Sequence, residues 1–320
     1  MSVDKKNVSD EDPLFSIVVP TFHRPRSLAR LLAAIQQLEF PLDRLEVIVV
    51  DDSGTDNLEP IVSPFRQSFP ILLLRTPHTG PAPARQFGID SARGRYLACT
   101  DDDCLPAPDW LKRLDAGFAE CPECAIGGPA INGLPENPFS STTQIVFDYV
   151  TSHWNRAEVS YLGTGNVTYP ARQFHDVGGL DRTWNLWGGE DRDLCRRWLA
   201  AGRRFRFDPG VRVYHYHPLN LRTFLGQHFR YGRGASRLYR QSAMQPPGFY
   251  RGLITAGFRG DGHHSGLVTG GLLLLAQAAT FCGFLYERLS AGLHGNPVPA
   301  RHPINATVPR DRSLQDRRVL

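Results

Sequence analysis

Short apolar runs alternate with segments of helical periodicity through the first hundred residues. Four runs have the length and character of buried strands: 15–20, 45–50, 71–74 and 96–100. Between them, residues 26–39 carry leucine and isoleucine at helical spacing, and residues 82–92 form a second helical segment. Strands that alternate with helices in this way predict βαβ units, and so an α/β fold whose mixed, mostly parallel sheet is flanked by helices.

The second half of the chain is less regular. A helix is expected from Glu190 to about Ala201, where Gly202 can end it. Other expected elements are a turn at 163–166, a strand at 167–169, an edge strand at 211–217, a helix at 221–240, a connector at 241–265 and a long apolar segment at 266–286. The resulting division is an α/β domain at 13–218, a helical C-terminal extension at 219–290, and flexible tails at 1–12 and 296–320.

Composition excludes some classes of function. With 36 basic and 32 acidic residues, the net formal charge is +4, so no nucleic-acid partner is expected. Cys121 and Cys124 form a CxxC pair, but no second pair stands at zinc-finger spacing, and reduced thiols are the expected state. The first residues are polar and lack the apolar core of a signal peptide, which favours a cytoplasmic protein.

Three consecutive carboxylates, Asp101–Asp103, follow the strand expected at 96–100. Like charges this close raise the energy of the folded chain unless a positive group neutralises them. Mg²⁺ and Mn²⁺ prefer oxygen ligands and usually keep positions open for substrate phosphates. The triplet therefore indicates a divalent-cation site, and a solvated acidic loop is the alternative.

Two other polar groups are expected near the same edge of the sheet. Asp51 and Asp52 follow the strand at 45–50, and ligands of parallel sheets bind at the carboxyl ends of strands. Their carboxylates could bind the base or ribose of a nucleotide, or simply form a turn. Arg85, in the second helical segment, could neutralise a phosphate or be an ordinary surface arginine.

Glu190 and Asp191 follow two glycines at the start of a helix. Carboxylates are favoured there by the helix dipole, so an ordinary acidic helix start is one interpretation. The other is a general base held on a rigid element, with the glycines leaving room for a substrate.

Five motifs in order give the chain a resemblance to a known family: Ser16–Arg24 (SIVVPTFHR), Val49–Ser53 (VVDDS), Thr100–Asp103 (TDDD), Val177–Asp181 (VGGLD) and Gly188–Asp191 (GGED). Together they resemble family 2 glycosyltransferases of the GT-A fold, over roughly residues 15–217. The resemblance implies an inverting enzyme that uses Mn²⁺ or Mg²⁺ and a nucleotide-sugar donor, usually a UDP-sugar.

The resemblance also implies roles for individual residues. The donor-binding residues would be Pro20, Thr21, Arg24, Asp51, Asp52, Arg85, Asp101 and Asp102. Asp103 would be the more direct metal ligand, with Asp101 as the other outer member of the DxD motif. Asp191 would be the catalytic base, with Glu190 beside it.

His215 and His217 stand two apart on an expected strand, so they share one face. By the same resemblance one of them, His217 by preference, would complete the metal site. Two structural histidines are the alternative.

One departure from the family is informative. Processive synthases carry Gln-x-x-Arg-Trp after the base, whereas this chain has Gln227-His-Phe-Arg-Tyr231. A non-processive enzyme that adds one sugar to a glycan or a lipid-linked acceptor is therefore expected. A nucleotidyltransferase is disfavoured because the loop after the first strand has no glycine, and a catalytically silent sugar-nucleotide-binding protein because Asp103 and Asp191 are present.

The extension indicates contact with a membrane surface. Arg230, Arg233, Arg237 and Arg240 fall on one helical face, which either is solvated or attracts phosphate or anionic lipid. Residues 266–286 carry no formal charge and are about long enough to span a bilayer. Attachment to the inner face of the cell membrane is expected ahead of a true span, with a helix buried in a soluble core as the further alternative.

Overall fold

The computed structural model describes residues 12–184, 186–240 and 244–294. The strands are β1 (Phe15–Thr21), β2 (Leu45–Asp51), β3 (Ile71–Arg75), β4 (Tyr96–Thr100), β5 (Cys104–Pro106), β6 (Ala125–Gly127), β7 (Ala130–Asn132), β8 (Asn166–Pro170), β9 (Phe205–Phe207) and β10 (Val213–His215). The α-helices are α1 (Pro25–Gln36), α2 (Glu59–Val62), α3 (Pro81–Asp90), α4 (Trp110–Glu120), α5 (Pro138–Trp154), α6 (Ala171–Asp176), α7 (Glu190–Ala200), α8 (Leu221–Leu238), α9 (Pro247–Phe258) and α10 (Gly266–His294). Two 3₁₀ turns are η1 (Leu42–Arg44) and η2 (Ser63–Gln67).

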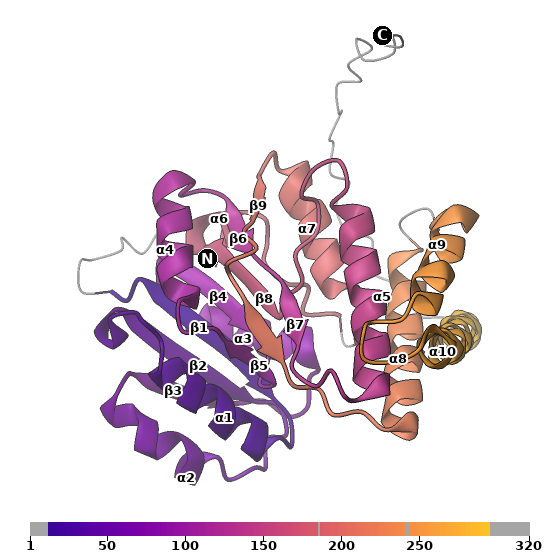
Figure 1. Cartoon of the computed structure of the whole chain (residues 1–320). Coiled ribbons are helices and arrows are strands. Elements are labelled where there is room, and N and C mark those ends of the chain that lie inside the picture. The colour runs from indigo at the N-terminus through magenta and orange to yellow at the C-terminus, as the bar shows by residue number, and fades with distance from the viewer. Residues whose placement is uncertain (1–11, 185, 241–243, 295–320) are drawn as a thin grey trace, which may run out of the picture.

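A seven-stranded mixed sheet in the order β3-β2-β1-β4-β8-β6-β9 forms the centre of the molecule (Figure 1). The strands β3, β2, β1 and β4 are parallel, β8 runs antiparallel between β4 and β6, and β9 is parallel to β6. In this mostly parallel sheet, the carboxyl ends of β1, β2 and β4 lie side by side and carry Thr21, Asp51 and the Asp101 loop.

Each face of the sheet is covered by its own helices. In β1, Ile17 and Val19 pack with α1 and α4, whereas Val18 packs with α3, α6 and α7. Successive residues of a strand point to opposite faces, so a fully apolar strand can serve two cores at once. This explains why the parallel strands read as continuous apolar runs rather than as alternating ones.

A second, three-stranded sheet in the order β5-β10-β7 lies next to the carboxyl end of β4. Its strand β5 begins at Cys104, directly after the aspartates, and the antiparallel register places Cys104 opposite His215 of β10. This pairing brings the two halves of the chain together at Asp103.

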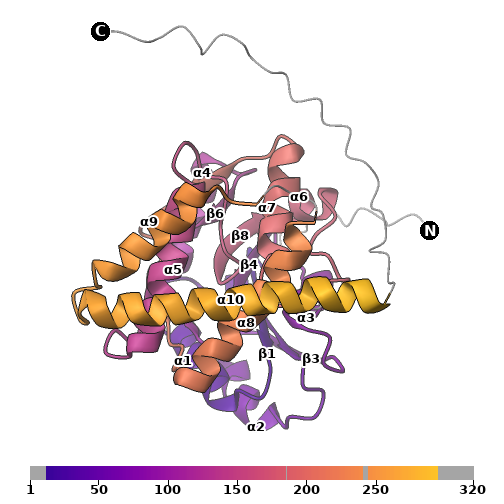
Figure 2. The ribbon, with the colours of Figure 1, turned by 90° about the vertical axis from the view of Figure 1, so that its right-hand side faces the viewer.

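The helical extension forms a layer beside the α/β domain, in which α10 packs against α8, α9 and α5 (Figures 1 and 2). Glycines allow α8 and α10 to cross closely: a Cβ on Gly232 would stand 1.9 Å from Thr280 O, and one on Gly283 would stand 1.9 Å from Phe229 O. The long α10 runs across the outside of this layer, with its apolar outer side uncovered.

The α/β class, the mixed sheet and the C-terminal helices confirm the expectations from sequence, with element ends that differ by a few residues. The strand expected at 211–217 is shorter, Val213–His215. The connector expected at 241–265 is wrong in part, because Pro247–Phe258 forms α9. The expected tails lie almost wholly outside the described residues.

Two further features were not anticipated. The segment 104–162 contains α4 and the 17-residue helix α5, to which no helix was assigned from sequence. Cys121 and Cys124 form a disulfide, which corrects the expectation of reduced thiols for this pair. Their Cα atoms lie 5.5 Å apart in the turn after α4, a separation that a disulfide readily bridges.

Candidate active site

Asp103 lies at the junction of the two sheets and is buried among positive groups. Its Oδ2 accepts a hydrogen bond of 2.7 Å from Arg24 Nη1, and its Oδ1 lies 3.4 Å from His215 Nε2. Burial by itself raises the pKa of Asp103, but the hydrogen bond and charge of His215, with the charge of Arg24, hold it well below its usual range. Asp103 is therefore an ionised carboxylate inside the protein.

The surroundings of Asp103 fit a divalent cation. Ligand atoms of Asp103, Cys104 and His215 all lie within 4.8 Å of one another. The carboxylate suits Mn²⁺ or Mg²⁺ and the imidazole adds a nitrogen ligand, whereas burial and nearby carboxylates raise the pKa of the Cys104 thiol well above its usual range. Among the three, Asp103 and His215 are the better ligands for a hard metal ion.

His217 lies next to this pair rather than in it. Its ring centroid is 5.1 Å from that of His215, and its buried Nδ1 has no hydrogen-bond partner among the described residues. Burial lowers the pKa of His217 to about 4, so the ring is neutral at pH 7. His215 is thus the histidine in contact with Asp103, and His217 as a metal ligand stays a prediction.

Asp102 holds the first strand against the acidic loop. Its Oδ2 accepts 2.7 Å from Thr21 Oγ1, and its Oδ1 accepts 3.1 Å from Arg24 Nη1. Burial raises the pKa of Asp102 to about 6, against the charge of Arg24. One guanidinium, that of Arg24, therefore bridges two neighbouring carboxylates at the carboxyl end of β1.

Asp101 points the other way, toward α3 and the loop before β8. Arg85 donates through Nη2 to Asp101 Oδ1 and through Nη1 to Thr164 Oγ1 at 3.4 Å. Arg85 is only 1% exposed, so the alternative of a surface arginine is wrong. A Cβ on Gly165 would come 3.1 Å from Asp101 Oδ2, so this loop passes close over the carboxylate.

Asp52 is already engaged in holding the loop between β3 and α3. Its Oδ1 accepts from Thr76 Oγ1 and from both the amide and hydroxyl of Thr79, and its Oδ2 accepts from Gly80 N at 2.9 Å. Asp51 is fully buried, where its Oδ1 accepts from Ser53. Both carboxylates shape the end of β2, and their contact with a nucleotide stays a prediction.

Exposed rings gather next to Asp52. The Phe22 ring contacts those of His23 and His78 in tilted arrangements, with centroid distances of 4.3 and 4.4 Å. Both histidines have a φ of 52°, a left-handed conformation that is uncommon outside glycine. Phe22 itself is 37% exposed, and an accessible ring of this kind offers a flat surface to a planar ligand.

Glu190 and Asp191 begin α7 in different environments. Asp191 Oδ2 accepts a hydrogen bond of 2.5 Å from Tyr161 Oη, and its Oδ1 accepts from Arg192 N at 2.7 Å. Glu190 is 8% exposed, and its Oε2 has no partner among the described residues. Burial and then the charge of Asp191 raise the pKa of Glu190 to about 8, while burial raises that of Asp191 against the bond from Tyr161.

The glycines before this pair serve the backbone rather than leave an open space. Gly188 and Gly189 have φ values of 84° and 97°, which other residues rarely adopt. A Cβ on Gly189 would stand 2.8 Å from Trp184, and Tyr231 of α8 lies against Gly188. The expectation that these glycines make room for a substrate is therefore wrong where α8 and Trp184 cover them.

The four arginines expected on one basic face, three in α8 and Arg240 just after its end, do not form a free basic surface. Arg233 pairs with Glu287 of α10 at 2.8 Å, and Arg237 donates to Thr183 O at 2.6 Å. Arg230 lies over the ring of Trp187, 5.0 Å from its centroid. These three side chains share one side of α8 but each contacts a different partner, so the expectation of one free basic surface is wrong.

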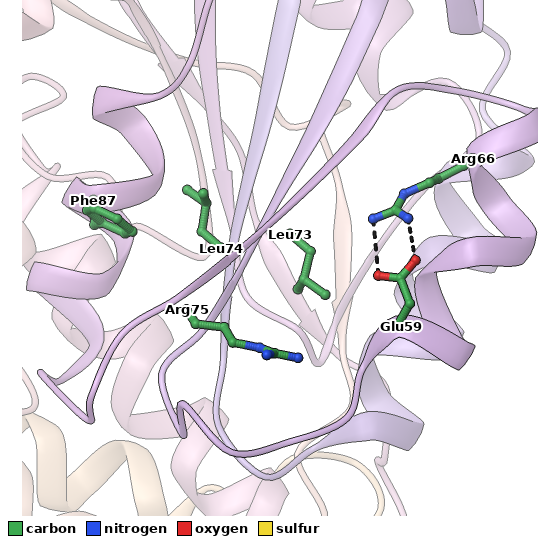
Figure 3. A pocket seen from close by; sticks show the side chains of 6 residues that line it. All are labelled: Glu59, Arg66, Leu73, Leu74, Arg75 and Phe87. Atoms are coloured by element: carbon green, nitrogen blue, oxygen red, sulfur yellow. Dashed lines mark hydrogen bonds and ion pairs between the residues drawn. The ribbon is translucent and has the colours of Figure 1, made fainter.

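A surface hollow lies on the outer edge of the sheet, lined by Glu59, Arg66, Leu73, Leu74, Arg75 and Phe87 (Figure 3). Arg66 is paired with Glu59 there, and β2 and β1 separate β3 from the acidic loop after β4. Neighbouring strands are about 4.8 Å apart, so the hollow stands roughly 14 Å from Asp101–Asp103. It is separate from the carboxylate site.

The structure thus brings most of the expected residues to one place. Arg85 contacts Asp101, and its charge also acts on the pKa of Glu190, which links the acidic loop to the start of α7. Sequence reasoning did not identify Tyr161 or Thr164. Neither residue stands within a motif, and nothing local marks a tyrosine as the partner of a carboxylate thirty residues further along the chain.

Family models and curated relatives match this chain over most of the α/β domain. The model of glycosyl transferase family 2 matches residues 16–176, and that of the N-terminal domain of galactosyltransferase matches residues 146–219. The pre-mycofactocin glycosyltransferase of Mycobacterium tuberculosis is 31% identical over 70% of this chain and 47% of its own length. Glycosyltransferase AglE of Haloferax volcanii is 30% identical over 71% of this chain and 74% of its own length.

Other relatives are longer proteins. The chondroitin synthase of Pasteurella multocida is 28% identical over 63% of this chain but only 25% of its own length. The chain therefore spans about half of the mycofactocin relative and a quarter of the chondroitin synthase.

Solved structures show the same fold. The mannosyltransferase PcManGT of Pyrobaculum calidifontis, in complex with GDP-Man and Mn²⁺, superimposes with a TM-score of 0.56 at 18% identity, over 90% of this chain and 77% of that one. TarS 1–349 of S. aureus, in complex with UDP-GlcNAc, gives a TM-score of 0.51 at 18% identity, over 87% of this chain and 74% of that one.

Proposed function

Because the chain belongs to glycosyl transferase family 2, we propose that it is a metal-dependent, inverting enzyme that moves one sugar from a nucleotide-diphosphate donor to a glycan or lipid-linked acceptor. One observation carries the proposal: Arg85 links the acidic loop to the start of α7. It donates a hydrogen bond to Asp101, and its charge lowers the pKa of Glu190. A donor at the acidic loop and an acceptor at the start of α7 would therefore meet in one site.

The residues around Asp103 would hold Mn²⁺ or Mg²⁺, with His215 as the second ligand and His217 beside it. When bound, such an ion supplies positive charge that stabilises a diphosphate leaving group. The chain adds fixed charges of its own, because Arg24 and Arg85 stand on either side of the aspartates. PcManGT, a structural neighbour, was solved with Mn²⁺, which supports this assignment without fixing the ion for this chain.

Asp191 is the catalytic base of the proposed mechanism. An acceptor hydroxyl would pass its proton to Asp191 as its oxygen bonds to the anomeric carbon and the bond to the diphosphate breaks. A single displacement of this kind inverts the configuration. Tyr161 and Arg192 N orient the Asp191 carboxylate and favour its charged form, whereas Glu190, with a pKa of about 8, is mostly protonated at pH 7.

The donor is proposed to be a UDP-sugar. Phe22 offers a ring to stack on a base, and Asp51 and Asp52 line the same end of β2. The two structural neighbours carry GDP-Man and UDP-GlcNAc, so their fold accepts either base. A lipid-linked acceptor would place the reaction at the inner face of a membrane, which agrees with the apolar outer side of α10.

A panel of nucleotide sugars tests this function directly. Nucleoside-diphosphate release would be measured with Mn²⁺, with Mg²⁺ and with chelator, for the wild type, Asp103→Asn and the exposed control Asp43→Asn. We expect metal-dependent release from one donor, at least about 100-fold slower in Asp103→Asn and unchanged in Asp43→Asn.

Folded protein that binds no donor would contradict the function. Equal rates in chelator and in Mn²⁺ would contradict the metal dependence alone.

A further inference from the structure

The outer side of α10 is apolar along almost its whole length. Its exposed large apolar residues are Leu267, Val268, Leu274, Leu275, Phe281, Leu285, Tyr286 and Leu289, and Phe258 of α9 is exposed beside them. Phe258 belongs to the same surface because its ring would contact a Cβ placed on Gly270 of α10. We call this surface the α10 face. Residues 266–286 carry no formal charge, so the α10 face is uninterrupted by ionised groups over about 30 Å of helix.

The opposite side of α10 is firmly attached to the protein. Leu273 and Ala276 are fully buried, and Thr269 Oγ1 donates 2.6 Å to Gly257 O of α9. The glycine contact between Gly232 and Thr280 O brings the backbones of α8 and α10 together. Near the end of the helix, Arg233 of α8 pairs with Glu287 at 2.8 Å.

We propose that the α10 face is a docking surface for an anionic lipid bilayer, on which α10 lies parallel to the membrane plane. An in-plane helix buries its apolar side in the boundary between headgroups and acyl chains, while its other side stays on the protein. This is the arrangement that α10 already has: it runs across the outside of the helical layer (Figure 2), with one side packed on α8, α9 and α5 and the other apolar and exposed among the described residues.

Charge favours a bilayer with anionic headgroups. Residues 219–290 contain eight arginines and two acidic residues, and residues 295–320 contain five arginines and two acidic residues. Arg251 of α9, Arg259 directly after α9 and Arg288 of α10 are exposed, and Arg288 falls seven residues after Phe281, on the α10 face. Basic residues close to an apolar surface strengthen binding to anionic membranes.

The same contacts argue against a spanning helix. By length and composition, Gly266–Ser290 could cross a membrane. A span would surround α10 with lipid and expose to hydrocarbon the Arg233–Glu287 pair and the α8 backbone at Gly232, unless α10 left the protein. The in-plane arrangement keeps these groups packed.

Flotation of the full chain with lipid vesicles tests the docking surface. Vesicles of phosphatidylcholine alone and of phosphatidylcholine with 30% phosphatidylglycerol would be compared, with and without high salt. The test variant is Leu274→Glu/Phe281→Glu, which puts charges on the α10 face. The matched control is Leu72→Glu/Phe207→Glu, because these two residues are 42% and 38% exposed and lie on the outer strands β3 and β9.

The wild type and the control are expected to bind the anionic vesicles at least ten times more tightly than the test variant. Salt should weaken the binding, and alkaline carbonate should release the bound protein. Circular dichroism would confirm that all variants are folded. Binding is measured without donor or acceptor, so its failure is distinguishable from failure of the proposed sugar transfer.

Three results would overturn the proposal. Absence of binding to anionic vesicles, or equal binding by the test variant, would show that the α10 face does not dock on lipid. Resistance to carbonate would show a spanning helix. A wild-type dimer in light scattering that becomes monomeric in the test variant, without vesicle binding, would show that a second copy of the chain covers the face.

Discussion

The hydroxyl of Tyr161 lies 2.5 Å from Asp191 Oδ2, and this hydrogen bond joins the loop before β8 to the first turn of α7. Its direction matters, because the phenol donates and the carboxylate accepts. The bond favours the ionised form of Asp191 and so opposes the rise in its pKa that burial causes. Tyr161 thus positions the residue proposed as base and tunes its charge.

Replacing this tyrosine should move the pH profile of the reaction. A base must be deprotonated to act, so the rate rises with pH through the pKa of Asp191. In Tyr161→Phe the stabilising donor is lost, the pKa of Asp191 rises further, and the acidic limb of kcat/KM should shift to higher pH. Rates from pH 5 to 9 would measure the shift. If the rate falls but the acidic limb of the pH profile does not shift, Tyr161 has only a structural role.

Substitution of the base itself should separate chemistry from binding. Asp191→Asn keeps the side chain's shape but cannot accept the proton, so transfer should fall by at least about 100-fold while donor affinity stays within about twofold. Single-turnover rates and donor titration by calorimetry would measure the two quantities. Lost donor affinity with an otherwise normal rate would count against Asp191 as the base.

Glu190 should make the protein less stable as the pH rises. Its pKa is raised from 4.5 to about 8 by burial and by Asp191, so the folded state holds a proton that the unfolded state has released between these values. Its contribution to stability is full below about pH 4.5 and is lost as the pH rises through 8. Relative to wild type, Glu190→Gln should therefore gain at least about 1 kcal/mol between pH 5 and pH 8.5. Urea unfolding at both pH values measures this gain, and a pH-independent difference would disprove the assignment.

Two identical substitutions on the helical layer should have opposite effects. Gly232→Ala places a Cβ 1.9 Å from Thr280 O, so we expect a loss of about 1–3 kcal/mol in the free energy of unfolding. Gly271→Ala on α10 meets nothing within 4 Å and should add about 0.5–1 kcal/mol through helix propensity. Denaturant midpoints would measure both. A neutral Gly232→Ala would mean that α8 and α10 separate easily.

Much of the α/β core was predictable because its signals are local. The apolar runs that became β1, β2 and β4 are buried on both faces, whereas β3 is a partly exposed edge strand. The carboxylates at the ends of β2 and β4 mark the carboxyl ends of parallel strands. The start of α5 also has a local signal, because Asn137 caps the helix and Pro138 is its first residue, but no helix was predicted there.

The sequence by itself determined the alternation of strands and helices over the first hundred residues, the apolar character of α10 and which chemical groups end the strands, because these follow from neighbours along the chain. Only the tertiary structure decided which of those groups meet. His215 reaches Asp103 because β10 pairs with β5, and Tyr161 reaches Asp191 across thirty positions. Likewise, the arginines of α8 contact separate partners because α8 packs between Gly188 and α10. Such contacts depend on long-range packing. A buried charge must be paired, but its partner can lie anywhere in the sequence, so the spacing of residues along the chain does not identify it.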